Sequence, residues 1–229
     1  MSPRARRILP AVLASIPVLA ILLALGTWQV RRLHWKNDLL AQIASAEAGP
    51  PVPLGDRPVA FSKVEATGRF RYDLEAILGV EVRGPVLGTR LITPLERDGH
   101  PAVLVDRGWV PLERRGAAIE RPEGPVSVTG YVSPPQDRDT FAATDDTAGR
   151  RFYTADPRAI GAALGLPGVM PDLLVALASP GARPDALPQG AATLPRPANS
   201  HLGYAITWYG LAASLVGVLV AWALRKDET

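Results

Sequence analysis

Two apolar segments free of charged residues, one near each end of the chain, constrain the fold more than any other feature of the sequence. They cover residues 8–30 and 201–224, and a helix of either length spans about 30 Å of hydrocarbon. Residues 31–200 lie between them, have the mixed composition of a soluble domain, and are numerous enough to form a hydrophobic core. The sequence therefore predicts an α+β membrane protein in which two transmembrane helices flank one extramembrane domain.

The first segment has a second interpretation, a cleaved secretory signal. A basic stretch at residues 4–7 precedes it, and residues 24–26 (Ala-Leu-Gly) form a passable cleavage site. However, the apolar run is longer than the core of a usual signal peptide, and it leads into Arg31 and Arg32 in the manner of a membrane exit. We therefore favour an uncleaved anchor.

Two spans place the tails, residues 1–7 and 225–229, on the same side of the bilayer. Basic residues flank both spans on both sides, and long loops translocate largely regardless of charge. The charge bias therefore favours cytoplasmic tails and an external domain only slightly. The tails carry Arg4, Arg6, Arg7, Arg225 and Lys226, and the other flanks carry Arg31, Arg32, Lys36 and Arg196.

Composition excludes several classes of site. The chain has no cysteine, which excludes disulfides and sites where thiolates hold zinc, copper or an iron–sulfur cluster. Two methionines are too few for a Met-rich copper carrier. The three histidines, His34, His100 and His201, lack the spacing of a metal-binding motif. The net charge of +3 is small and no basic run is interleaved with aromatic residues, so nucleic acid binding has little support.

The domain is predicted to be mostly antiparallel β, as a sheet or a small barrel with short helices. Residues 63–70 alternate between polar and apolar side chains, which is typical of a half-buried strand. Short strands separated by Gly and Pro favour the same architecture. The further expected strands are residues 76–83, 87–95, 102–110 and 126–132, with weaker signals at 152–155 and 173–178.

Helical signals are fewer in residues 31–200. Asp156 is suited to cap a helix over residues 157–164, which begins with Pro157. Apolar residues spaced i, i+4, i+8 over residues 35–43 predict that the first span continues as a helix beyond the membrane. Pro-rich connectors, expected to be extended and fairly stiff, are residues 49–53 and 179–200.

Three segments, taken together, carry a recognisable signature. They are Gly-Thr-Trp-Gln-Val-Arg-Arg-Leu-His-Trp-Lys at residues 26–36, Val-Leu-Val-Asp-Arg-Gly-Trp-Val-Pro at 103–111, and Asn-Ser-His-Leu-Gly-Tyr-Ala-Ile-Thr-Trp-Tyr-Gly-Leu-Ala at 199–212. With this order of span, domain and span, the chain resembles the Surfeit locus protein 1 family, assembly factors for haem–copper cytochrome c oxidase.

The resemblance implies a location, a role and a ligand. It implies a two-pass protein of the bacterial inner membrane, with both tails cytoplasmic and residues 31–200 periplasmic. It implies that the protein binds haem a transiently and aids its insertion into the largest oxidase subunit, with that subunit and haem a synthase as partners. It further implies that the histidine at the start of the second span, here His201, binds the haem iron.

The residues around His201 allow two interpretations. His201, Tyr204 and Trp208 are spaced i, i+3, i+7, so they share one stripe of the second helix. An imidazole backed by aromatic surface suits haem iron and a macrocycle edge. The alternative is a belt of aromatic anchors at the membrane interface. The residues alone favour the belt, whereas the family resemblance favours the ligand.

The basic residues at the exit of the first span also allow two interpretations, as partners of haem or as interfacial residues. Arg31 and Arg32 could pair with haem propionates, because guanidinium matches carboxylate geometry. The alternative, which their position favours, is that they extend toward lipid headgroups. His34 could be a second axial ligand, although surface exposure suits its sequence context better.

Two further patterns have structural interpretations. Gly203, Gly210 and Gly217 recur every seven residues, and this small-residue face is expected to pack on the first span, with an oxidase helix as the alternative partner. Residues 106–109 (Asp-Arg-Gly-Trp) are interpreted as a fold element. There, Arg107 is expected to stack on Trp109, with a bulge or close backbone approach at the glycine between them.

No motif indicates an enzyme: the sequence lacks a nucleophile elbow, a phosphate loop and an HExxH motif. The leading interpretation is a non-enzymatic factor that binds haem a. One alternative is a membrane-anchored scaffold that stabilises an oxidase assembly intermediate and binds no cofactor. The other is a membrane-bound enzyme that modifies haem.

Overall fold

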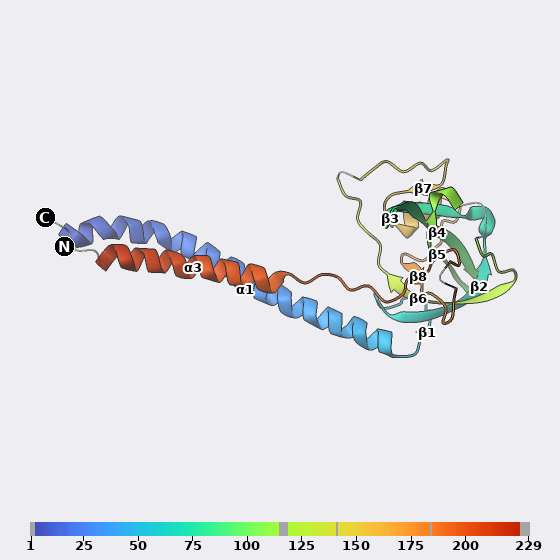
Figure 1. Ribbon diagram of the computed structural model, residues 1–229, viewed down its shortest axis with the longest axis horizontal. Coiled ribbons are helices and arrows are strands. Elements are labelled where there is room, and N and C mark those ends of the chain that lie inside the picture. The colour runs from blue at the N-terminus through green and yellow to red at the C-terminus, as the bar shows by residue number, and fades with distance from the viewer. Residues whose placement is uncertain (1–2, 115–118, 141, 184, 225–229) are drawn as a thin grey trace. The chain divides into compact units, whose positions relative to one another are not determined.

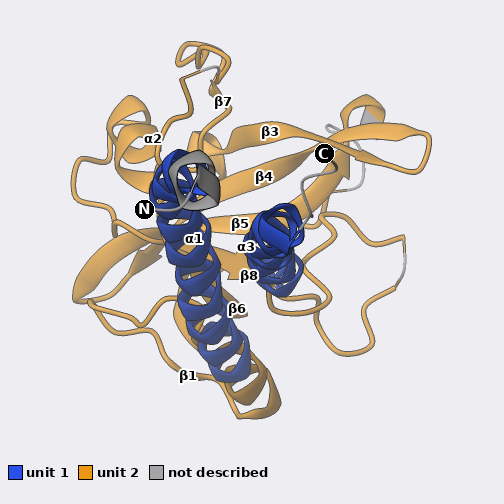
Figure 2. Ribbon diagram, turned by 90° about the vertical axis from the view of Figure 1, so that its left-hand side faces the viewer, with its two compact units in different colours: residues 1–42, 196–229 blue, residues 43–195 orange. Residues whose placement is uncertain are grey.

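A computed structural model describes residues 3–114, 119–140, 142–183 and 185–224. It divides into two compact units, which are coloured separately in Figure 2. A helical unit comprises residues 1–42 and 196–229, and a domain comprises residues 43–195. The architecture confirms the predicted fold class, an N-terminal and a C-terminal apolar helix that flank a domain composed mostly of sheet (Figure 1).

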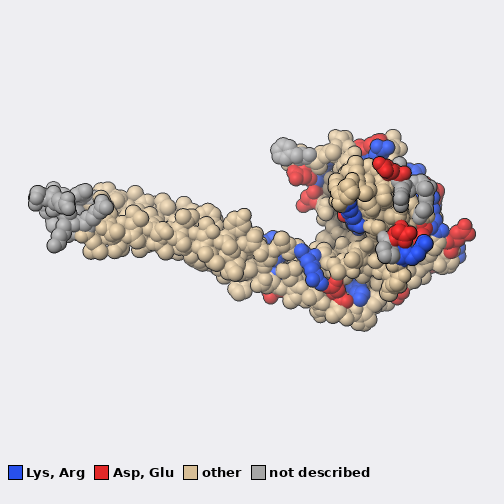
Figure 3. Space-filling model, viewed as in Figure 1, with Lys and Arg blue, Asp and Glu red and all other residues tan. Residues whose placement is uncertain are grey.

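Two long helices dominate the helical unit. They are α1 (Pro3–Ala48), whose last turns belong to the domain, and α3 (His201–Leu224). α1 continues past residue 30 without interruption, as the apolar spacing predicted. Within the described chain, residues 8–48 and α3 are long and apolar enough to cross a membrane. The face drawn in Figure 3 has no charged side chain along the apolar length of this unit.

The domain is built on a sheet whose strands match the predicted segments closely. β2 and β3 begin and end at the predicted residues, and the next two strands extend one to two residues further at each end. The strands are β1 (Val52–Pro53), β2 (Lys63–Phe70), β3 (Ala76–Arg83), β4 (Val86–Arg97), β5 (His100–Pro111), β6 (Pro125–Ser133), β7 (Arg151–Phe152) and β8 (Leu173–Ala176).

Strand pairing closes the central part of the sheet into a small barrel. The order is β1-β2-β6-β8-β5-β4-β3-β7, and β2 pairs again with β4, so the ring β2-β6-β8-β5-β4 returns to its start. Closure depends on Gly68, because a Cβ there would lie 2.2 Å from the carbonyl oxygen of Glu96. Most pairs are antiparallel, as predicted, but β1–β2, β3–β7 and β5–β8 are parallel.

The hydrophobic core lies against this closed ring. β4 and β5 are buried on both faces: Ile92 and Leu104 belong to one core cluster and Leu95 and Val105 to another, and all four are completely buried. A helix, α2 (Pro157–Ala163), covers part of the core through Ile160. Its capping prediction is confirmed: the Asp156 carboxylate accepts hydrogen bonds from the backbone N–H groups of the first turn at 3.0 and 3.2 Å.

Some segments differ from the predictions. β7 ends at Phe152, because the next backbone N–H, that of Tyr153, donates to the side chain of Asp145 at 2.7 Å rather than to a strand. Residues 49–53, expected to be only a connector, contain the edge strand β1. Short 3₁₀ helices occur at η1 (Tyr72–Leu74) and η2 (Leu112–Arg114).

The second Pro-rich stretch is not a simple spacer. Its backbone at Gln189 exchanges two hydrogen bonds of 2.9 Å with Trp109, and Leu187 and Leu194 are buried. The domain extends to Pro195, so only the last few residues of the predicted connector 179–200 belong to the helical unit.

Candidate functional site

Hydrogen bonds between side chains join α1 to α3, and to the residues just before α3, close to His201. Thr27 contacts the hydroxyl of Tyr209 at 3.1 Å, and Asn37 accepts from Asn199 at 2.9 Å. Contact partners run in opposite directions along the two segments, so the helices are antiparallel. Gly26 fits the ring of Tyr209, since a Cβ there would lie 2.9 Å from it.

His201 occupies the first position of α3 and is partly buried. Its Nδ1 lies 2.7 Å from Oε1 of Gln29, a side chain that α1 holds in a buried position, with 8% exposed. The side chain of Asn199 accepts from the backbone N–H of His201 at 3.4 Å, which helps to begin the helix at this residue. Gln29 therefore holds the imidazole, and Asn199 holds the backbone of the same residue.

Gln29 was not identified in the sequence as a partner of His201. The available signal was an uncharged amide within an apolar span, because such a group needs a hydrogen-bond partner. Sequence spacing within one helix could not reveal that the partner lies on another helix.

The other aromatic residues of the predicted stripe are placed differently. The contact face of α3 follows positions 201, 205, 208 and 212, of which Ala205 and Ala212 are 3% and 4% exposed. Trp208 is partly buried on this face with His201. Tyr204 is 55% exposed at its flank, because the i+3 position is rotated by about 60° from the first.

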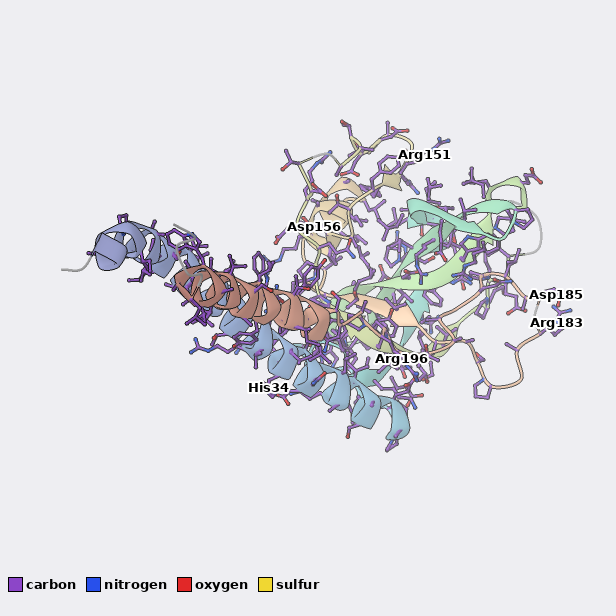
Figure 4. All side chains as sticks on the ribbon, turned by 60° about the vertical axis from the view of Figure 1, so that its left-hand side comes forward. His34, Arg151, Asp156, Arg183, Asp185 and Arg196 are labelled. Atoms are coloured by element: carbon purple, nitrogen blue, oxygen red, sulfur yellow. The ribbon has the colours of Figure 1, made fainter. Side chains whose placement is uncertain are left out.

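The basic residues of α1 do not face the imidazole. Arg31 and Arg32 are exposed, and the guanidinium carbon of Arg32 lies 3.8 Å from the ring centre of Trp35 in a cation–π contact. His34 is exposed on the side of α1 away from α3 (Figure 4). The structure thus brings together His201, Gln29 and Trp208, and it places Arg31, Arg32 and His34 on other faces of α1.

The glycine face of α3 does not pack on α1, contrary to the expectation from its spacing. A Cβ at Gly203, Gly210 or Gly217 would have no neighbour within 4 Å. The contact is instead made by the face that contains Ala205 and Ala212, which lies opposite the glycines. Position in the helix rather than residue size alone decides this, since alanine is also small enough for close helix approach.

Inside the domain, the motif at residues 106–109 is structural. Arg90 donates to the carboxylate of Asp106, and this carboxylate also accepts from the backbone N–H of Gly108 at 3.0 Å. Burial raises the pKa of Asp106, and the Arg90 guanidinium opposes that shift. A cleft of about 390 Å³ lies beside the pair, with Tyr131 and Glu81 in its lining. Since Arg90 and Asp106 satisfy each other, we assign them to the fold.

The predicted stacking of Arg107 on Trp109 is wrong. The guanidinium carbon of Arg107 instead lies 5.1 Å from the ring centre of Phe70 and 5.2 Å from that of Tyr72. The ring of Trp109 is contacted by Arg83, whose guanidinium carbon lies 5.1 Å from its centre. The reason is a β-bulge between Asp106 and Gly108, whose extra residue breaks the alternation of side chains. The predicted close approach at Gly108 is confirmed, because a Cβ there would lie 2.1 Å from the carbonyl oxygen of Gln189.

The side chains near His201 limit the kind of metal group that this site can bind. Among the described residues, no group of three His, Cys, Asp or Glu is arranged to hold a metal ion. A single imidazole does not make a site for a free ion. It is, however, sufficient as an axial ligand for iron whose other ligands belong to a macrocycle.

Comparison with known proteins gives a consistent match over most of the chain. The model of the SURF1 family matches residues 16–213. Surfeit locus protein 1 of Takifugu rubripes is 28% identical over 226 aligned residues, covering 88% of this chain and 92% of that protein. The human Surfeit locus protein 1 is 28% identical, with 89% and 73% covered. A SURF1-like protein of Rickettsia bellii is 29% identical, with 86% and 83% covered.

Proposed function

Because this chain belongs to the SURF1 family of cytochrome c oxidase assembly factors, we propose that it binds haem a at His201 and aids its insertion into the largest oxidase subunit. The observation that carries the proposal is the imidazole at the start of α3, partly buried and held 2.7 Å from Gln29. Haem a, when bound, would supply an iron that takes a nitrogen ligand from the protein.

The chain's own residues have distinct parts in this proposal. His201 would supply a nitrogen ligand to the haem iron, and Trp208, partly buried on the same helix face, would supply flat apolar surface. Tyr204 can contribute only from the flank, since it is mostly exposed. Arg31 and Arg32 remain the proposed partners of the propionates, although they lie on other faces of α1 than Gln29 and Arg32 contacts the ring of Trp35.

The haem content of purified variants tests the proposal. The full chain is purified in detergent from cells that make haem a, and the ratio of haem to protein is measured. We expect His201→Ala to lose most of the bound haem, because alanine offers no ligand, while the oxidase spectrum of the host membranes declines. Trp208→Ala should weaken binding less, since it removes packing and leaves the iron ligand in place.

His34→Ala is the matched control, because His34 lies on α1 but is exposed on the far side from α3. It should retain wild-type haem. If His201→Ala also retained wild-type haem a, the imidazole would be an interfacial anchor, and the scaffold that binds no cofactor would become the leading interpretation.

The proposed role is non-enzymatic, since it needs a ligand and a partner surface but no catalytic group. Its partners are the largest oxidase subunit and haem a synthase, and its location is the bacterial inner membrane with residues 31–200 in the periplasm. Conversion of haem o by the purified protein would contradict the non-enzymatic role and support the haem-modifying alternative.

A further inference from the structure

The contact between Gln29 and His201 bears on which nitrogen of the imidazole carries the proton. The amide oxygen of Gln29 can only accept a hydrogen bond, and the atom 2.7 Å from it is Nδ1 of His201. A hydrogen bond between these two atoms requires the proton to be on Nδ1. In a neutral imidazole the other nitrogen, Nε2, then has its lone pair available.

The environment of Gln29 makes this contact well defined. Only 8% of Gln29 is exposed, and its position in the middle of α1 fixes its backbone. Neighbouring interhelical contacts, Thr27 with Tyr209 and Asn37 with Asn199, hold the two segments together on either side. A buried amide that lost its partner would be left with an unsatisfied polar group, so the pairing with His201 is favoured.

We propose that Gln29 is a positioning residue that holds His201 in the Nδ1–H tautomer and presents Nε2 as the ligand nitrogen. This inference rests on the proposed function, because it assigns Gln29 a role at the same site. The second nitrogen of a metal-binding histidine is commonly fixed by a hydrogen bond of this kind, and removing such a partner typically weakens metal affinity about 10- to 100-fold.

The first measurement needs no haem. Nitrogen-15 NMR of histidine-labelled, haem-free full chain in detergent distinguishes the Nδ1–H from the Nε2–H tautomer, and comparison with His201→Ala assigns the signals of His201. We expect wild-type His201 to be mostly the Nδ1–H tautomer. Gln29→Leu, which has no acceptor, should shift the equilibrium toward Nε2–H, the usual preference of a free imidazole.

Two variants control this measurement. Gln29→Glu keeps an acceptor oxygen at the same place and, measured at a pH where the imidazole is neutral, should restore the wild-type tautomer. Thr27→Val removes a neighbouring interhelical hydrogen bond but does not touch His201, so it should leave the tautomer unchanged. A wild-type tautomer in Gln29→Leu, or an Nε2–H tautomer in the wild type, would overturn the assignment.

The second measurement is titration of the same variants with haem a. Gln29→Leu should bind at least about 10-fold more weakly than the wild type, and Gln29→Glu should recover affinity. If His201→Ala loses haem while Gln29→Leu binds as tightly as the wild type, the positioning role fails and the proposed function stands. If His201→Ala binds haem normally, the proposed function fails, and the tautomer measurement still reports on Gln29.

Discussion

At the scale of single residues, Arg90 compensates the charge of Asp106. The side chain of Asp106 is 3% exposed, and Arg90 is the cation that pairs with it. Removing one partner of a buried ion pair leaves an uncompensated charge, which costs about 3–5 kcal/mol. Replacing both partners avoids that cost. A comparison of the single and the double variant therefore shows whether the unpaired charge causes the loss of stability.

We expect Arg90→Met to lower the free energy of unfolding by about 3–5 kcal/mol. The double variant Arg90→Met/Asp106→Asn should recover much of the loss, because asparagine is uncharged and can still accept from Gly108. Denaturant unfolding of the full chain in detergent, followed by tryptophan fluorescence, measures both values. Equal losses in the single and double variants would show that the unpaired charge is not the cause.

Gly108 is required for two reasons, its φ of 126° and the carbonyl of Gln189 that a Cβ would meet. We expect Gly108→Ala to destabilise the domain by more than the roughly 1–3 kcal/mol of backbone strain alone. Gly84→Ala is the control, since Gly84 also has a positive φ, of 57°, but no neighbour within 4 Å of a Cβ. A loss no larger than that of the control, measured by the same unfolding assay, would remove the steric argument.

At the scale of elements, α3 contacts α1 through the face that carries Ala205 and Ala212. Ala212 is 4% exposed at the contact, whereas a Cβ at Gly210 would meet nothing within 4 Å. Small residues allow close helix approach only where a second helix is present. The two positions therefore offer opposite predictions for the same substitution.

Ala212→Leu should separate the helices, and Gly210→Leu should leave them paired. Because the chain has no cysteine, Asn37→Cys and Asn199→Cys can be introduced as a pair and joined by a short bifunctional reagent. We expect Ala212→Leu to lower the cross-linking yield severalfold and Gly210→Leu to leave it near that of the parent. A lower cross-linking yield for Gly210→Leu than for Ala212→Leu would place the glycine face, rather than the alanine face, at the contact.

At the scale of the whole molecule, the proposed function requires residues 31–200 to lie in the periplasm. The basic residues flank both spans and decide little by themselves. We predict that a reporter enzyme active only in the periplasm is active when fused after Gly49, and that one active only in the cytoplasm is inactive there. Activity of the cytoplasmic reporter at Gly49 would contradict the periplasmic domain and the proposed delivery of haem.

Local patterns in the sequence were enough to predict most of the secondary structure. Period-two alternation located β2 to the residue, a Gly-Pro break marked the end of β3, and Asp156 with Pro157 marked the start of α2, because these signals act between neighbouring residues. The apolar segments likewise identified α1 and α3 as the elements long enough to cross a membrane. The histidine at the start of α3 was also apparent from sequence.

Which faces and which distant groups meet depends on how the elements pack on one another, and local patterns do not show it. Barrel closure through Gly68, the bulge that separates Arg107 from Trp109, and the alanine rather than glycine face of α3 all depend on register and rotation between elements. The partner of His201 is 172 residues away in the chain. No local pattern encodes such a pair, because its energy arises only when two elements, each already formed, present complementary polar atoms to one another.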